Sequence, residues 1–202
     1  MRRLIRLFVI GAALVVARPA LAVDDCASVG MTVTAQVSTD PGFEGLYKYT
    51  VSGSWDVGQY GLSHIDFFLT LKDLECICDP RVAQFASPAG TSGGEGVTDP
   101  CTVLYAGKYN CKGDPTVPEE LRAPTIKFDA IDDACEPGVT GTGTWVFYSP
   151  FPPAPYSVDP AGVAIKHGLQ VCLGQLAGTM PMGDCSTPAQ TKSWGGVKAI
   201  YR

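Results

Sequence analysis

Apolar and polar side chains alternate along most of this chain, and this alternation restricts the fold more than any other feature. In residues 47–57, one face carries Tyr47, Tyr49, Val51, Gly53, Trp55 and Val57. The intervening residues are the polar Lys48, Thr50, Ser52, Ser54 and Asp56. A period of two is typical of a β-strand with one face on a core and the other in water. Residues 31–37 (MTVTAQV) alternate in the same way.

Turn-forming clusters separate many such stretches, which indicates an all-β fold. Glycine, proline, aspartate and serine gather in segments such as SPAGTSGGEG (87–96) and CEPGVTGTG (135–143). Short strands at this spacing predict an antiparallel β-sandwich of the jelly-roll or immunoglobulin-like kind, and no amphipathic helix stands out. The further strands are predicted at 63–71, 81–86, 101–105, 108–112, 124–130, 142–149, 162–167 and 169–177.

The first 22 residues have the pattern of an export signal. Arg2, Arg3 and Arg6 precede an apolar run from Leu7 to Ala17, and Ala20-Leu21-Ala22 supplies a small-x-small cleavage site. The run is too short for a membrane span, which needs about 20 residues. We therefore predict a secreted protein, extracellular or periplasmic, that has no membrane attachment after cleavage.

The remaining chain is predicted to form one domain and a tail. A sandwich domain is expected at 23–186, because about 180 residues fit a single domain. Residues 187–202 form a polar segment that ends in SWGGVKAIYR. This tail is either a flexible end or a short sorting or docking signal.

Charge argues against nucleic acid as a partner. Four of the 15 basic residues lie in 1–22, so 11 remain against 20 acids, a net charge of −9. Phosphate backbones and anionic lipid repel such a protein.

All eight cysteines lie beyond the signal, namely Cys26, Cys76, Cys78, Cys101, Cys111, Cys135, Cys172 and Cys185. An even number in an exported chain predicts disulfides. Two local pairs are plausible, Cys101–Cys111 around a hairpin turning at Ala106-Gly107 and Cys172–Cys185 around the last loop. They would leave Cys26 and Cys135 for the Cys76/Cys78 pair.

Several stretches occur in an order that is shared with other proteins. They are LSHIDFFL (62–69), CKGDPT (111–116), TIKFD (125–129), GTWVFYS (143–149) and VAIKHG (163–168). This order resembles a group of uncharacterised secreted bacterial β-sandwich modules. The chain departs from the group's pattern at Ala123-Pro124 and in the insertion VPEELRA (117–123). The resemblance implies fold and export, and it brings no activity with it.

Three groups of residues are candidate metal sites. His64 and Asp66 share one strand face, yet a structural strand with a hydrogen-bonded histidine is favoured over metal binding or catalysis. Cys76 and Cys78 lack zinc spacing, so two disulfides are favoured. The acids Asp129, Asp132, Asp133 and Glu136 offer oxygen ligands for calcium, although a solvated acidic loop is the default. No cofactor is expected, with calcium as the one alternative.

A proline-rich loop supplies the candidate ligand contacts. Phe151, Tyr156 and Tyr148 lie in FYSPFPPAPY (147–156), where prolines stiffen the backbone. Such rings stack on sugars or grip an extended peptide, or else they fold back over one end of the domain.

The motifs of common enzyme classes do not occur in this sequence. It has no Gly-x-Ser-x-Gly, no His-Glu-x-x-His, no phosphate-binding loop and no dinucleotide fingerprint. We therefore predict a non-catalytic extracellular or surface module that binds carbohydrate or protein or serves a structural role. The alternative is a secreted hydrolase that uses a pair of carboxylates.

Overall fold

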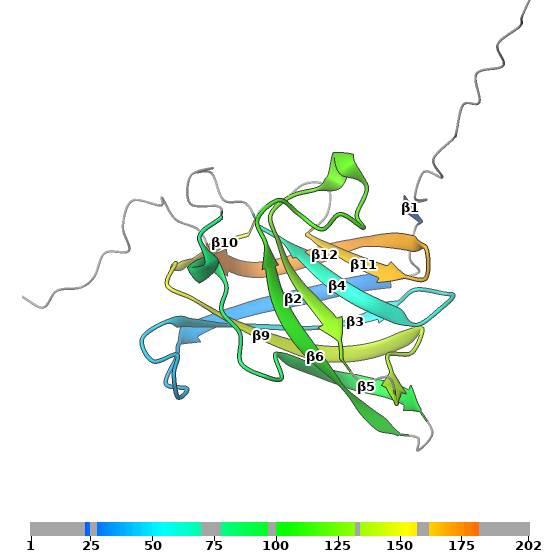
Figure 1. Ribbon diagram of the computed structural model, residues 1–202, viewed down its shortest axis with the longest axis horizontal. Helices are drawn as coiled ribbons and strands as arrows, with labels where there is room; N and C mark the ends of the chain where they lie inside the picture. The colour runs from blue at the N-terminus through cyan, green and yellow to red at the C-terminus, as the bar shows by residue number, and fades with distance from the viewer. Residues whose placement is uncertain are drawn as a thin grey trace, which may run out of the picture.

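The computed structural model describes residues 23–24, 28–69, 78–96, 100–131, 134–156 and 162–181. The predicted signal peptide, the C-terminal tail and Cys26, Cys76 and Cys185 lie outside these residues. In the described residues, the regular structure consists of strands and two single-turn 3₁₀ helices (Figure 1). They are β1 (Val23–Asp24), β2 (Ser28–Val37), β3 (Tyr47–Asp56), β4 (Leu62–Phe68), η1 (Pro80–Val82), β5 (Gly90–Gly96), β6 (Cys101–Asn110), η2 (Glu119–Leu121), β7 (Thr125–Ala130), β8 (Cys135–Glu136), β9 (Thr140–Ser149), β10 (Pro153–Pro155), β11 (Val163–His167) and β12 (Gln170–Pro181).

The main sheet closes on itself. Its order is β12-β11-β4-β7-β6-β5-β9-β3-β2, and β2 pairs again with β12, in parallel, so nine strands form a closed barrel (Figure 1). The predicted sandwich is therefore wrong, although the all-β class and the disulfides are confirmed. The error has a physical reason, because inward and outward side chains alternate equally in a sandwich and in a barrel.

Closure depends on the long last strand, which changes partner halfway along. Residues up to Gly174 pair with β11, where Gly174 lies opposite Val163. From Gln175 to Gly178 the strand pairs with β2, beginning at Gly30, and its last residues pair with β10. A side chain at Gly174 would meet Val29 and Val163, so glycine permits the close approach of three strands at this seam.

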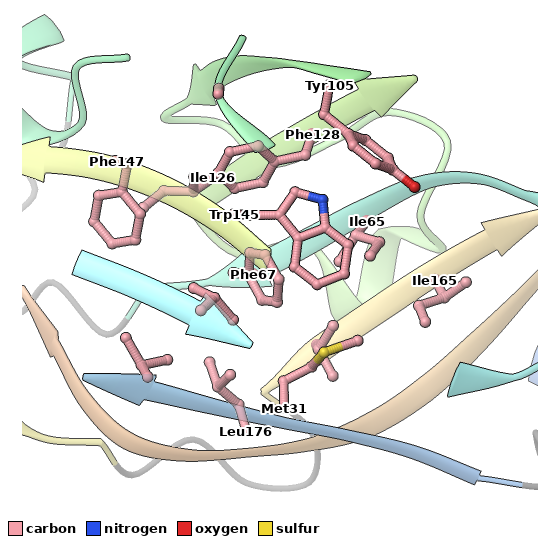
Figure 2. Close-up of a cluster of buried hydrophobic side chains, with 14 of the residues drawn as sticks. Met31, Ile65, Phe67, Tyr105, Ile126, Phe128, Trp145, Phe147, Ile165 and Leu176 are labelled. Atoms are coloured by element: carbon pink, nitrogen blue, oxygen red, sulfur yellow. The ribbon is translucent and has the colours of Figure 1, made fainter. Parts of the chain in front are cut away.

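Large aromatic rings fill the barrel. Trp145 is fully buried, and its ring centroid lies 5.6 Å from that of Tyr105 and 6.0 Å from that of Phe67 (Figure 2). Trp55 and Phe128 pack against the same ring, with centroids at 6.1 and 6.5 Å. The predicted inner face of residues 47–57 is confirmed by the burial of Tyr49, Val51, Trp55 and Val57.

The glycines of β9 make room for these rings. In TGTGTW (140–145), a side chain at Gly141 would meet the ring of Trp55, and one at Gly143 would meet the ring of Trp145. The alternating threonines therefore point outward into solvent, where all three are exposed.

Three local predictions are wrong. The hairpin expected at Ala106-Gly107 is one continuous strand, β6, in which Gly107 leaves space for the ring of Phe85. The cluster expected to turn at 90–96 is strand β5, and its inward Gly90 leaves space for Trp145. The strand expected at 81–86 begins inside η1, because the Asp79 side chain caps that turn and accepts a hydrogen bond from the Arg81 amide.

Of the two local pairs that the sequence indicated, Cys101–Cys111 is wrong, and Cys135 is not a partner of the Cys76/Cys78 pair. Cys78 bonds to Cys111 and Cys101 bonds to Cys135. The continuous β6 explains why Cys101–Cys111 does not form, since ten residues of strand span roughly 30 Å and a disulfide needs about 6 Å between Cα atoms. Cys172 is also disulfide-bonded, whereas its predicted partner Cys185 lies outside the described residues.

Candidate functional site

A polar groove runs over the outer surface of β3, β9 and β5. Ser52, Thr144 and Thr91 lie side by side in the strand register and are exposed. The hydroxyls of Ser52 and Thr144 lie 3.3 Å apart, and Ser54 and Thr142 form the next pair of the register. Because strands lie about 4.8 Å apart, the register produces a regular grid of hydroxyl groups.

Two hollows that share Gly93 and Thr142 make up this groove. The larger has a volume of about 580 Å³ and the smaller about 470 Å³. Glycines and small hydroxyl residues dominate both linings, so backbone groups as well as hydroxyls are accessible to a ligand. The larger hollow also contains Asp56 and Glu95, and the Asp56 carboxylate accepts a hydrogen bond from the Gly58 amide.

The predicted aromatic contacts lie outside this groove and are covered by other parts of the chain. Phe151 is 5% exposed and belongs to the core, and its carbonyl accepts a hydrogen bond from the Tyr49 hydroxyl. Tyr156 donates to the Phe68 carbonyl, while Tyr148 donates to Asp40 and stacks on Phe43. The rings therefore fold back over the barrel, which corrects the expectation that this loop presents an aromatic surface.

The predicted calcium acids do not form a described cluster. Asp129 lies on β7 and pairs with Lys127, whose ammonium is 3.2 Å from its carboxylate. Glu136 is exposed on the short strand β8. Asp132 and Asp133 lie outside the described residues.

A second site is buried between the barrel wall and a covering loop. His64 and Asp66 point outward from β4, as their predicted common face requires, because Ile65 and Phe67 fill the interior. The segment 111–124 lies over this part of the wall. Its Val117 and Leu121 pack with outward-facing Phe68, Ala164 and Val171.

The loop adds Asp114 to the histidine and aspartate of β4. The Nε2 atom of His64 lies 3.6 Å from the Asp66 carboxylate and 3.8 Å from that of Asp114. Asp114 also accepts two hydrogen bonds from Thr116, one from its amide and one from its hydroxyl, each 2.7 Å long. Lys127 completes the surroundings, with its ammonium 2.7 Å from the Asp114 carboxylate.

The pKa values of the three ionisable groups in this cluster are shifted from their ordinary values. Burial, and then repulsion from Asp114, raises the pKa of Asp66 to about 8. Burial, and then repulsion from Lys127, lowers the pKa of His64 to about 4. Burial opposes ionisation of Asp114 as well, but its bonds to Lys127 and Thr116 prevail and hold its pKa at about 2. At neutral pH the site therefore contains a neutral histidine, a protonated Asp66 and an ionised Asp114.

The sequence predicts only part of this buried cluster. The alternation placed His64 and Asp66 on one face, and Asp114 appeared only as part of the shared stretch CKGDPT (111–116). In the structure this stretch forms a turn, in which Thr116 donates two hydrogen bonds to Asp114. The alternation did not connect that turn with β4. The sequence feature that could have linked them is that LSHIDFFL (62–69) and CKGDPT (111–116) both belong to the shared order of stretches.

The fold and these two sites define a disulfide-bonded, closed β-barrel with a hydroxyl-lined outer groove and a buried acid–histidine cluster. In the described part of the chain, no helix has the length and apolar character to cross a membrane. Comparisons with known protein families, with characterised proteins and with solved structures find no match to this chain.

Proposed function

We propose that this protein is an exported, non-catalytic module that binds an extracellular glycan along the hydroxyl-lined groove of β3, β9 and β5. The observation that carries the proposal is the in-register row of Ser52, Thr144 and Thr91 within an open groove. Hydroxyl groups donate and accept hydrogen bonds alike, so a row of them complements the hydroxyls of a sugar chain.

The distribution of charge in the groove favours an uncharged ligand. Its centre carries neutral hydroxyls and glycine backbone, and its two acids, Asp56 and Glu95, both line the larger hollow. With a net negative charge on the mature chain, this surface repels phosphates and polyanions. A neutral polysaccharide meets no such barrier.

Two further observations support export. The two described disulfides are compatible with an oxidising compartment. The first 22 residues have the composition of a secretory signal. Mass spectrometry of the protein secreted by its host would test this, with a mature N-terminus at Val23 as the expected result.

Binding is tested with the mature protein on an array of neutral glycans and matrix proteins. Replacing Thr91, Thr142 and Thr144 by valine removes three hydroxyls and preserves side-chain shape and strand propensity. The matched control carries Thr32→Val and Thr34→Val on exposed positions of β2 that do not line either hollow. We expect glycan binding by the wild type and the control and at least a tenfold loss in the groove variant. Binding to proteins alone would contradict a glycan ligand.

Hydrolysis by a carboxylate pair is the second candidate, because Asp56 and Glu95 line the same hollow. Product release from a bound glycan would establish it. The activity would then disappear in Asp56→Asn and Glu95→Gln variants that still bind the glycan. Binding without turnover in the wild type would support the non-catalytic module.

A further inference from the structure

The buried cluster under the loop 111–124 contains a carboxyl group that makes no hydrogen bond within the described part of the chain. Asp66 is 1% exposed, and neither of its oxygens has a hydrogen-bond partner among the described residues. Buried carboxylates normally accept hydrogen bonds or meet a cation, and leaving one without either is unfavourable. A group that is absent from the chain itself would satisfy these oxygens.

We propose that His64, Asp66 and Asp114 bind a divalent transition-metal cation of the Zn²⁺ type, which fastens the loop 111–124 to the barrel wall. Each residue directs one ligand atom into the cluster, and all three atoms lie within 4.8 Å of one another. This site is separate from the glycan groove, and the proposal does not depend on the proposed function.

The spacing of the ligand atoms fits a tetrahedral cation. Ligands about 2.1 Å from a tetrahedral Zn²⁺ lie roughly 3.4 Å from each other. The observed separations of His64 Nε2 from the carboxylate oxygens of Asp66 and Asp114 are 3.6 and 3.8 Å. A contraction of a few tenths of an ångström would bring these two separations to the tetrahedral spacing. The ligand oxygens of Asp66 and Asp114, which lie within 4.8 Å of each other, would also have to move together when a cation binds.

The identity of the ligands favours a transition metal over calcium. One imidazole nitrogen and two carboxylates suit Zn²⁺, Co²⁺ or Mn²⁺. Calcium takes six to eight oxygens, more than these two carboxylates supply. Asp129 is placed to supply the outer contact that such sites use. Its carboxylate lies 3.8 Å from Nδ1 of His64, so a slight approach would let it accept a hydrogen bond from Nδ1 and fix the histidine tautomer.

A bound cation has two competitors. The Thr116 hydroxyl lies 3.2 Å from Nε2 of His64, within hydrogen-bond distance of the proposed ligand atom. Lys127 is the second. Its ammonium already lies 2.7 Å from the Asp114 oxygen that would coordinate the metal. It also lies 3.2 Å from Asp129, and its side chain is 14% exposed, so it can turn toward Asp129 when a cation arrives. Removing the lysine charge should therefore strengthen metal binding, whereas removing a ligand should abolish it.

The test measures melting temperature and bound metal in the mature, disulfide-bonded protein after EDTA treatment and dialysis. Zn²⁺, Co²⁺ and Mn²⁺ are each compared with Ca²⁺ and Mg²⁺. At a concentration about a hundredfold above Kd, a binding cation should raise Tm by roughly 5 to 10 °C. We expect this for Zn²⁺ with one ion per chain, and we expect Co²⁺ to give the intense visible absorption of a tetrahedral site.

Three variants make the result specific. Asp66→Asn keeps the shape of the side chain and should lose the zinc-induced shift. Lys127→Met should bind zinc at least tenfold more tightly than the wild type. Glu136→Gln, which removes an exposed acid of β8 outside the cluster, should behave as the wild type. The proposal is overturned if Zn²⁺ leaves the wild-type Tm unchanged, if Ca²⁺ alone raises it, or if Asp66→Asn retains the full shift.

Discussion

Asp66 and Lys127 lie directly opposite each other in the register of β4 and β7, yet they form no ion pair within the described residues. Lys127 pairs instead with Asp114 of the covering loop and with Asp129 two residues along its own strand. A cross-strand pair of opposite charges would ordinarily stabilise the sheet. Here Lys127 pairs with Asp114 of the loop. Asp66 stays protonated at neutral pH because burial raises its pKa to about 8.

This arrangement predicts a pH dependence for the metal-free protein. The pKa of Asp66 rises on folding from 3.8 to about 8, so its contribution to stability is present at low pH and lost as pH rises toward 8. The pKa of His64 falls from 6.5 to about 4, so its contribution increases as pH rises to 6.5. Each group changes the free energy of unfolding by at most about 1.4 kcal/mol per pH unit, and below pH 6.5 the two changes have opposite signs.

Only the Asp66 slope remains above pH 6.5, so the free energy of unfolding should fall between pH 6.5 and 8. Urea unfolding in EDTA at several pH values measures this. The Asp66→Asn variant should lose the fall, while Asp114, Asp129, Lys127 and Lys166, which also face the pair, are unchanged in the comparison. An equal fall in the variant would show that another group is responsible.

Alanine substitutions at two glycines of the barrel seam, Gly174 and Gly30, should change the free energy of unfolding by very different amounts. Gly174→Ala places a methyl group against Val29 and Val163 where three strands meet, and such overpacking costs about 1 to 3 kcal/mol. Gly30, which pairs with Gln175 on the same seam, has no atom near the position of an added methyl group. Gly30→Ala should therefore leave stability unchanged or raise it slightly. Equal effects in thermal unfolding would be inconsistent with the closure described here.

The disulfide Cys101–Cys135 closes a loop with a sequence separation of 34 residues. Its loss in a Cys101→Ser/Cys135→Ser double variant should reduce the free energy of unfolding by roughly 3 to 4 kcal/mol, as measured by urea denaturation. Non-reducing peptide mapping of the wild type should recover the Cys101–Cys135 and Cys78–Cys111 peptides. A Cys101–Cys111 peptide would contradict the continuous strand β6.

The proline-rich loop is expected to contribute stability and not ligand contacts. Because Phe151 is buried in the core, Phe151→Ala should destabilise the protein by about 3 to 5 kcal/mol in thermal or urea unfolding. Its glycan binding, measured well below the lowered Tm, should equal that of the wild type. A selective loss of binding with unchanged stability would instead assign the loop to ligand recognition.

Alternation alone predicted most strands and their inward faces, since the period of two is local to each strand. It could not predict closure, because the partner change of β12 at Gly174 involves β2, which lies far away in sequence. Glycines misled the prediction at β5 and at Gly107, where they make room for Trp145 and Phe85 instead of forming turns. Only His64 and Asp66 of the buried cluster could be placed together from the sequence. Asp114 reaches His64 only when the loop 111–124 folds over the barrel wall.

Glycan recognition by the groove is tested most directly by the affinity of the mature protein for neutral glycans, measured for the wild type and for Thr91→Val/Thr142→Val/Thr144→Val. We expect saturable binding of a neutral glycan by the wild type and at least a tenfold weaker affinity in the variant, with equal melting temperatures. Equal affinities in the two proteins, or no glycan bound by the wild type, would contradict glycan recognition by the groove.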